Sequence, residues 1–295
     1  MMAFPSQASN QKWGACLAKT PTSRFKIGTI SILHLALIIA ATFGCLSIQA
    51  AEPSPTGEDH EFEELGINRY TAPSIAQIFK QLDELKPLPF DQLKRDVPQT
   101  AGITREQKGL IFGELIADGF LLVEAERKNL IGSFGRVLMR QARALGVGDR
   151  VMRHSASLIE LGRRGEWPRV RQELITTQAD VEQAMVELRD EKMAHLISLG
   201  GWLRGLEICA KTIELDLSPQ HARILAQPDL ANYFANELST LPPPLARRAL
   251  FEKIRIGIKI LQPLLSKSPD TLTSADVQAI RVQATELNNA IQQGN

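Results

Sequence analysis

The stretch MAHLISLGGWLRGLEICAKTI (193–213) carries apolar residues at the spacing of one face of an α-helix. This apolar stripe consists of Leu196, Leu199, Leu203, Leu206 and Ala210, widened by Trp202, Cys209 and Ile213. Beside it runs a stripe of small residues formed by Ala194, Ser198, Gly201 and Gly205. Because glycine costs about 1 kcal/mol against alanine inside a helix, we expect a neighbouring helix to approach closely along this second stripe.

A matching pattern of small residues occurs in the segment 104–128. Thr104 followed three residues later by Gln107 is typical of a helix start with a capping box. The small residues of this segment are Gly109, Gly113, Ala117 and Gly119. Close contact between the two helices through these small faces is the favoured interpretation. The alternative is that the missing side chains leave room for a ligand beside Trp202.

Glu114 and Asp118 lie one helical turn apart in that same segment, which is otherwise apolar from Leu110 to Val123. Two carboxylates at this spacing are able to bind a metal ion or to divide acid and base roles. A narrow solvent-facing stripe, or an ion pair with an arginine of a neighbouring helix, is the favoured interpretation. If a pocket exists, we expect it to be lined by Glu114, Asp118, Trp202, Gly201 and Gly205.

The helical period continues through the rest of the chain from residue 72, and no convincing strand pattern occurs. The sequence therefore predicts an all-α fold, a multi-helix, antiparallel, bundle-like domain that follows an N-terminal signal segment. The expected helices are 73–85, 89–96, 104–128, 129–145, 149–162, 167–188, 191–214, 219–226, 229–239, 245–262 and a last helix from Ser274. We expect Pro263 to end the helix before it.

The N-terminus has the three parts of a secretory signal. Its basic residues end at Lys26, the apolar stretch ISILHLALIIAA (30–41) follows, and small residues precede Glu52. We expect cleavage near Ala50 or Ala51 and an exported protein, periplasmic or extracellular. An uncleaved anchor is the alternative, and membrane contact is expected only in that case.

Four regions follow from these patterns. They are a signal peptide at 1–50, an acidic flexible tether at 51–71, a main helical domain at 72–241 and a C-terminal helical pair at 242–295 that packs on the main domain. The boundary between the last two is set by the proline run Pro242–Pro244.

Arginine is concentrated between residues 136 and 171, where nine arginines face three acidic residues. Arg136, Arg140 and Arg143 share one helical face, and Arg150 and Arg153 follow across a tight turn. Guanidinium groups match phosphate and carboxylate geometry, so this segment is a candidate site for an anionic partner. The acidic segment 173–191 offers an internal alternative, and we expect it to neutralise the arginines by packing against them.

No sequence motif for catalysis, a metal ion or a cofactor occurs in the chain, so no catalytic residue, metal ligand or cofactor is predicted. With a formal net charge of +1, the chain is not expected to bind nucleic acid. We expect an exported, non-enzymatic helical interaction or scaffold protein whose partner is a protein or an anionic component of the cell envelope. The alternative is a protein that binds a small ligand or anion, or an unrecognised enzyme, with a cavity between the glycine-containing helices.

Overall fold

The computed structural model describes residues 75–96 and 104–294 of the chain. Every regular element in these two ranges is a helix, which confirms the all-α fold. The helices are α2 (Ile75–Glu84), α3 (Phe90–Leu93), α4 (Arg105–Glu124), α5 (Lys128–Ala144), α6 (Gly148–Arg164), α7 (Trp167–Leu188), α8 (Glu191–Leu215), α9 (Pro219–Ala222), α10 (Pro228–Ser239), α11 (Pro243–Ala246), α12 (Ala249–Leu265), the 3-10 helix η2 (Pro269–Thr271) and α13 (Ser274–Gln293).

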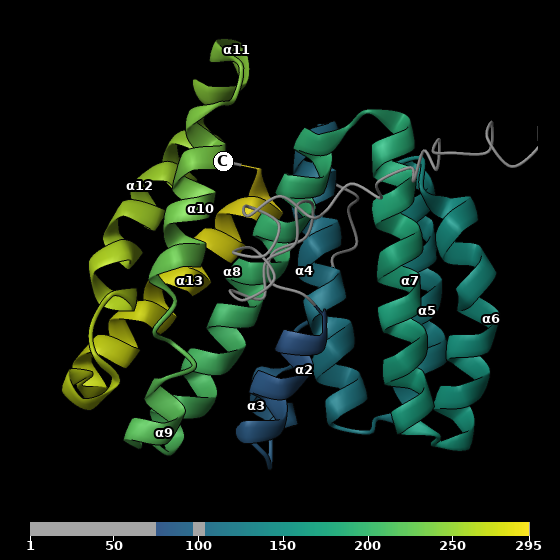
Figure 1. The fold of residues 1–295 in the computed structure, drawn as a ribbon, viewed down its shortest axis with the longest axis horizontal. Coiled ribbons are helices and arrows are strands. Elements are labelled where there is room, and N and C mark those ends of the chain that lie inside the picture. Colours follow the sequence, from purple (N-terminus) through teal and green to yellow (C-terminus); the bar gives the residue numbers. More distant parts are fainter. Residues whose placement is uncertain (1–74, 97–103, 295) are drawn as a thin grey trace, which may run out of the picture. The chain divides into compact units, whose positions relative to one another are not determined.

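Helices α4 and α8 lie side by side at the centre of this arrangement (Figure 1). On one flank of the central pair, α13 packs against α8, and α12 packs against both α13 and α10. On the other flank, α5 packs against α4, α6 against α5, and α7 against α6. The chain therefore leaves the centre after α4, makes the three-helix excursion α5–α7, and returns to the centre as α8.

The contact between α4 and α8 is close because glycines of one helix face the backbone of the other. A Cβ atom on Gly113 would lie closer than 3.0 Å to the carbonyl oxygen of Ile197, and one on Gly200 equally close to that of Leu110. Gly201 also faces α4, and its would-be Cβ would lie 3.3 Å from the carbonyl oxygen of Gly113, which is still a tight contact. The predicted close contact of the two helices is thus present at Gly113, Gly200 and Gly201, whereas a Cβ atom on Gly205, which was also expected to face α4, would have no neighbouring atom within 4 Å.

The start of α4 is tied to the end of the last helix. The Thr104 hydroxyl accepts a hydrogen bond from the Gln107 backbone amide, which is one of the two bonds of the predicted capping box. The Gln107 side chain donates to the carbonyl oxygen of Ile291 in α13 at 2.9 Å. This amide therefore connects two helices that are far apart in the sequence.

The prediction that Pro263 ends its helix was wrong, because α12 continues to Leu265. Leu261 and Leu265 are both fully buried, one on each side of the proline. Their burial holds the last turn in place although proline removes one backbone hydrogen bond.

The predicted signal peptide, its cleavage site and the acidic tether lie outside the described residues. None of the helices in 75–96 and 104–294 combines the length and apolar character that a bilayer-spanning segment needs.

Candidate functional site

Glu114 and Asp118, the two carboxylates singled out from the sequence, belong to a buried ion-pair network. Arg95, in the segment after α3, places Nη2 3.0 Å from Glu114 Oε2 and Nε 2.7 Å from Asp118 Oδ2. Arg204 of α8 donates from Nε to Asp118 Oδ1 at 2.7 Å. An ion pair with an arginine of a neighbouring helix was the favoured interpretation, and Arg204 forms it.

The network extends from α8 to α13 and to the segment after α3. Arg204 also contacts Glu207 Oε2 at 2.8 Å and donates to the carbonyl oxygen of Leu93 at 2.6 Å. Glu207 in turn accepts hydrogen bonds from Asn288 and Thr285 of α13. Four separate segments are therefore held together by charge-assisted hydrogen bonds away from water, where such bonds are strong.

The pKa values of two glutamates in this network are shifted in opposite directions. Burial raises the pKa of Glu114 to about 8, against the opposing effect of the nearby Arg95 guanidinium. Burial would also raise the pKa of Glu207, but the charge of Arg204 keeps it below its ordinary value. At neutral pH the Glu114 carboxyl is therefore protonated, whereas Glu207 is ionised beside Arg204.

Three of the residues predicted to line a pocket, Gly201, Trp202 and Gly205, line a cavity that is too small for a small-molecule ligand. Its volume is about 30 Å³, and its lining is mainly apolar. Ligand pockets generally span about 300–1,000 Å³. The indole nitrogen of Trp202 donates to Gln227 at 2.8 Å, and its ring stacks on Phe234. Gly205 has open space beside it, whereas Glu114 and Asp118 face the ion-pair network, so the five predicted residues do not line one polar pocket.

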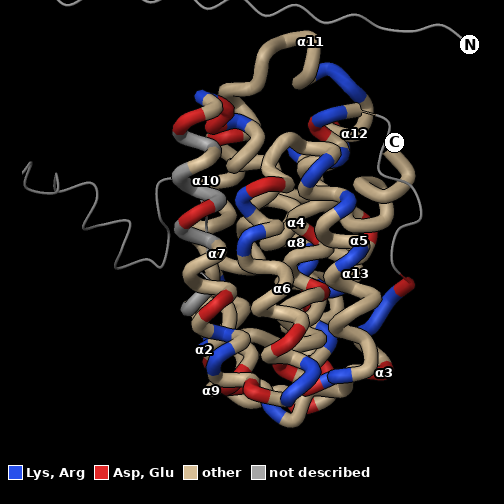
Figure 2. The backbone as a smooth tube through the Cα atoms, turned by 90° about the vertical axis from the view of Figure 1, so that its right-hand side faces the viewer, with Lys and Arg blue, Asp and Glu red and all other residues tan. Residues whose placement is uncertain are grey.

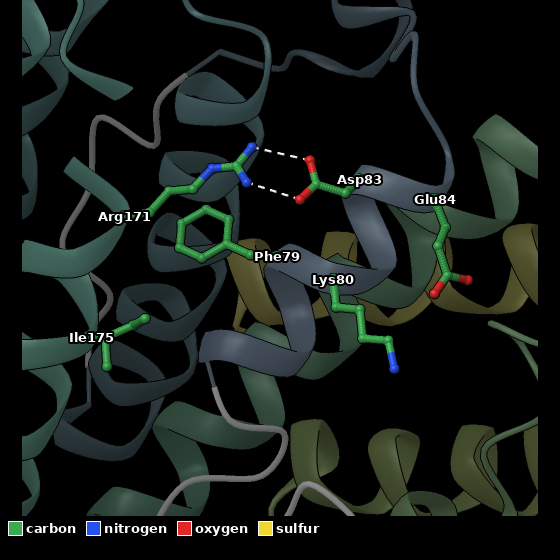
Figure 3. Close-up of a pocket in the computed structure, with 6 residues that line it drawn as sticks. All are labelled: Phe79, Lys80, Asp83, Glu84, Arg171 and Ile175. Atoms are coloured by element: carbon green, nitrogen blue, oxygen red, sulfur yellow. Dashed lines mark hydrogen bonds and ion pairs between the residues drawn. The ribbon is translucent and has the colours of Figure 1, made fainter. Parts of the chain in front are cut away.

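A larger groove, about 490 Å³ and open to solvent, runs between α2 and α7 (Figure 3). Arg171 and Asp83 point toward each other across it, with atoms 2.8 and 3.0 Å apart, while Lys80 points away from that pair. Arg171 also pairs with the buried Glu124 and lies over the ring of Phe79. These interactions connect α2, α4 and α7. The two charged groups that face each other across the groove, Asp83 and Arg171, therefore already have ionic partners within the protein.

Of the five arginines predicted to bind an anion, two form ion pairs with α7 and three do not. In α6, Arg150 pairs with Glu187 of α7, and Arg153 pairs with Asp180 at 3.2 Å. Internal neutralisation by the acidic segment thus applies to these two arginines. Arg136, Arg140 and Arg143 of α5 are exposed and form no ion pair with the described side chains of that segment.

These three exposed arginines form a single stripe, which we call the α5 arginine face. The spacing of four and three residues places Arg136, Arg140 and Arg143 on the same side of the helix. Helix α5 contains no Asp or Glu, so it offers no partner of its own. Figure 2 views the molecule from the side of α5–α7 and shows Lys and Arg positions in blue on that side. Arg143 donates a hydrogen bond from Nη2 to the sulfur of Met152 at 3.4 Å.

His154 lies between α6 and α7 with a carboxylate at each ring nitrogen. Nδ1 is 3.0 Å from Glu173, and Nε2 is 3.1 Å from Asp180. Burial alone would lower the pKa of His154, but the two carboxylates raise it above its ordinary value. Because the carboxylates contact opposite sides of the ring, they do not converge on a shared metal position. Within 75–96 and 104–294, no cluster of three His, Cys, Asp or Glu residues is arranged to hold a metal ion.

Sequence reasoning did not single out Arg95, Arg204 or Glu207. Arg204 gave a usable signal, since a lone arginine among the apolar residues at the centre of α8 requires a buried partner. Arg95 gave none, because it follows a four-residue helix and meets α4 only through the tertiary fold.

Comparisons of the chain with protein families, with curated proteins and with solved structures find no match.

Proposed function

We propose that this chain is an exported, non-enzymatic interaction or scaffold protein that binds an anionic component of the cell envelope through the α5 arginine face. The observation that carries the proposal is a set of three exposed arginines, on a helix without acidic residues, that form no ion pair within the described part of the chain. Among the described residues of α6, by contrast, Arg150, Arg153 and Arg164 each have a carboxylate partner. Arginine forks that remain unpaired are available to phosphate or carboxylate groups of a partner.

The proposal of a binding surface is also supported by the filled centre of the molecule. The position next to Gly205 holds only about 30 Å³, which leaves little basis there for the alternative of a small-ligand or catalytic pocket. The proposal of export is supported by the basic and apolar N-terminal pattern of the sequence. Mass spectrometry of the protein from its native envelope fraction tests it, and an intact N-terminus in a cytoplasmic fraction would contradict it.

Binding is tested by reversing the charge of the α5 arginine face. The full-length triple variant Arg136→Glu/Arg140→Glu/Arg143→Glu is compared with wild type for binding to phosphatidylglycerol vesicles and to polyglutamate. We expect wild type to bind at least one of these probes, with binding that weakens steeply above about 0.15 M salt, where screening lengths fall to about 8 Å. We expect the triple variant to lose binding while its melting temperature changes little, because exposed charges contribute little to stability.

A matched control reverses three exposed basic residues elsewhere in the structure. The variant Arg223→Glu/Lys253→Glu/Lys259→Glu makes the same change in net charge on α12 and beside α9. We expect it to bind as wild type does. Equal loss of binding in both variants would show that only the net charge matters, and binding of neither probe by wild type would contradict the proposed function.

A further inference from the structure

A notch between the start of α5 and the end of α6 brings two guanidinium groups to the same point. The point is the position that a Cβ atom would occupy on Gly132 of α5. Arg163 Nη2 of α6 lies 3.8 Å from it and Arg136 Nη1 of α5 lies 3.9 Å from it. The missing side chain of Gly132 therefore leaves an open position flanked by two cationic groups from different helices.

Neither guanidinium group has an anionic partner. Both arginines are exposed, and neither forms an ion pair with any residue in the described part of the chain. The nearby acidic residues are engaged elsewhere, since Glu160 pairs with Arg164 at 2.8 Å and Glu166 pairs with Arg169. The two guanidinium groups carry like charges and repel each other, so an anion between them would relieve that repulsion.

A third cation lies at the same end of the helix pair. A Cβ atom on Gly165, which ends α6, would lie closer than 3.0 Å to the ammonium nitrogen of Lys128, the first residue of α5. Lys128 is exposed as well. The ammonium group of Lys128 therefore lies beside Gly165, two residues after Arg163 in the sequence. Its charge adds to the positive potential around the notch.

From this geometry we infer that the notch over Gly132 is a binding site for a phosphate group, held between Arg136 and Arg163. Phosphate oxygens point in tetrahedral directions and accept hydrogen bonds from two forks that approach from different helices. A single fork can pair with both oxygens of a carboxylate, whereas a phosphate group has a further oxygen that can accept from the second fork. The inference rests on the proposed function, since it specifies which anionic group the basic surface recognises.

The test compares two double variants that remove the same charge. The full-length variant Arg136→Gln/Arg163→Gln removes both sides of the notch, whereas Arg140→Gln/Arg143→Gln removes two arginines of α5 outside it. The probes are inorganic pyrophosphate in solution, phosphatidylglycerol vesicles and polyglutamate. We expect the notch variant to lose affinity for the phosphate probes by roughly tenfold or more and the control to lose much less. Binding of pyrophosphate would identify a free phosphate ligand, and binding of vesicles alone would identify a lipid headgroup.

A second pair of variants tests the geometry without a ligand. Gly132→Asp places a carboxylate between the two guanidinium groups, and Gly132→Asn places a neutral group of the same size there. We expect the aspartate variant to melt at a higher temperature than the asparagine variant and to bind pyrophosphate more weakly.

Three results would overturn the inference and leave the proposed function intact. They are equal losses of affinity in the two double variants, equal affinity of wild type for polyglutamate and the phosphate probes, and equal melting temperatures of the two Gly132 variants. Absence of binding to all three probes would instead contradict the proposed function itself.

Discussion

Two glycines of α8 are expected to respond in opposite ways to the same substitution. A methyl group on Gly200 would lie closer than 3.0 Å to the carbonyl oxygen of Leu110, which is helix backbone and cannot rotate away. A methyl group on Gly205 would meet no atom within 4 Å. We therefore expect Gly200→Ala to destabilise the protein and Gly205→Ala to stabilise it.

The magnitudes follow from packing and helix propensity. Overpacking generally costs about 1–3 kcal/mol, and the upper end applies to Gly200 because the obstructing atoms belong to the backbone of α4. Alanine recovers about 1 kcal/mol of helix propensity at either position, so we expect a net loss of about 2 kcal/mol for Gly200→Ala and a gain of about 1 kcal/mol for Gly205→Ala.

Thermal unfolding followed by circular dichroism measures the difference. For a domain of this size, 1 kcal/mol shifts the melting temperature by about 2–4 °C, so the two variants are expected to melt roughly 6–12 °C apart. Urea unfolding at constant temperature provides an independent measure of the same free energies. If Gly200→Ala melts at or above the temperature of Gly205→Ala, the close approach of α4 and α8 at Gly200 is not present in solution, and the reasoning fails.

Three further predictions concern titratable groups. Because the two carboxylates raise the folded-state pKa of His154, its stabilising contribution is present at pH values below about 6.5 and is lost as the pH rises through the folded value. His154→Gln should flatten this dependence in urea unfolding at several pH values, and an unchanged slope would contradict the ion-pair geometry. Glu114, with its pKa raised to about 8, binds more protons in the folded than in the unfolded state above about pH 4.5, so the unfolding free energy falls with pH through that window. Glu114→Gln should remove this part of the slope, and an unchanged slope in the variant would show that the carboxyl is ionised when buried. Burial raises the pKa of the Cys209 thiol to about 12, so a thiol reagent at neutral pH should label it only at the rate of unfolding, and rapid labelling of the native protein would contradict its burial.

Helix type and position were predictable from the sequence because the apolar period and the caps act locally. Helix α7 was expected at 167–188 and spans Trp167–Leu188, where the apolar residues recur at helical spacing. The sequence did not predict as well which side of α8 meets α4. Gly200 and Gly201 differ by about 100° around the helix axis, and only the position of α4 determines which of them makes the closest contact.

The candidate site was predictable only in part, because it depends on pairs of residues that are distant in the sequence. The α5 arginine face was visible as a charge pattern, but its lack of partners depends on how α6 and α7 pack. The same limit applies to the notch, since Arg163 approaches Gly132 only through the antiparallel packing of α6 on α5. The buried partner of Asp118 could be anticipated as an arginine, whereas Arg95 could not.

The excursion α5–α7 has a consequence for how the native protein opens. In α5 the buried residues are Ile131, Gln141 and Ala142, whereas α4 and α8 are buried along most of their lengths. Elements with few buried contacts open locally at a free energy below that of global unfolding. Backbone amides of α5 and α6 should therefore exchange with deuterated solvent faster than those of α4 and α8. An anion that bridges the ends of α5 and α6 would slow exchange in those two helices while leaving the central pair unaffected, so exchange rates can locate a bound partner before its identity is known.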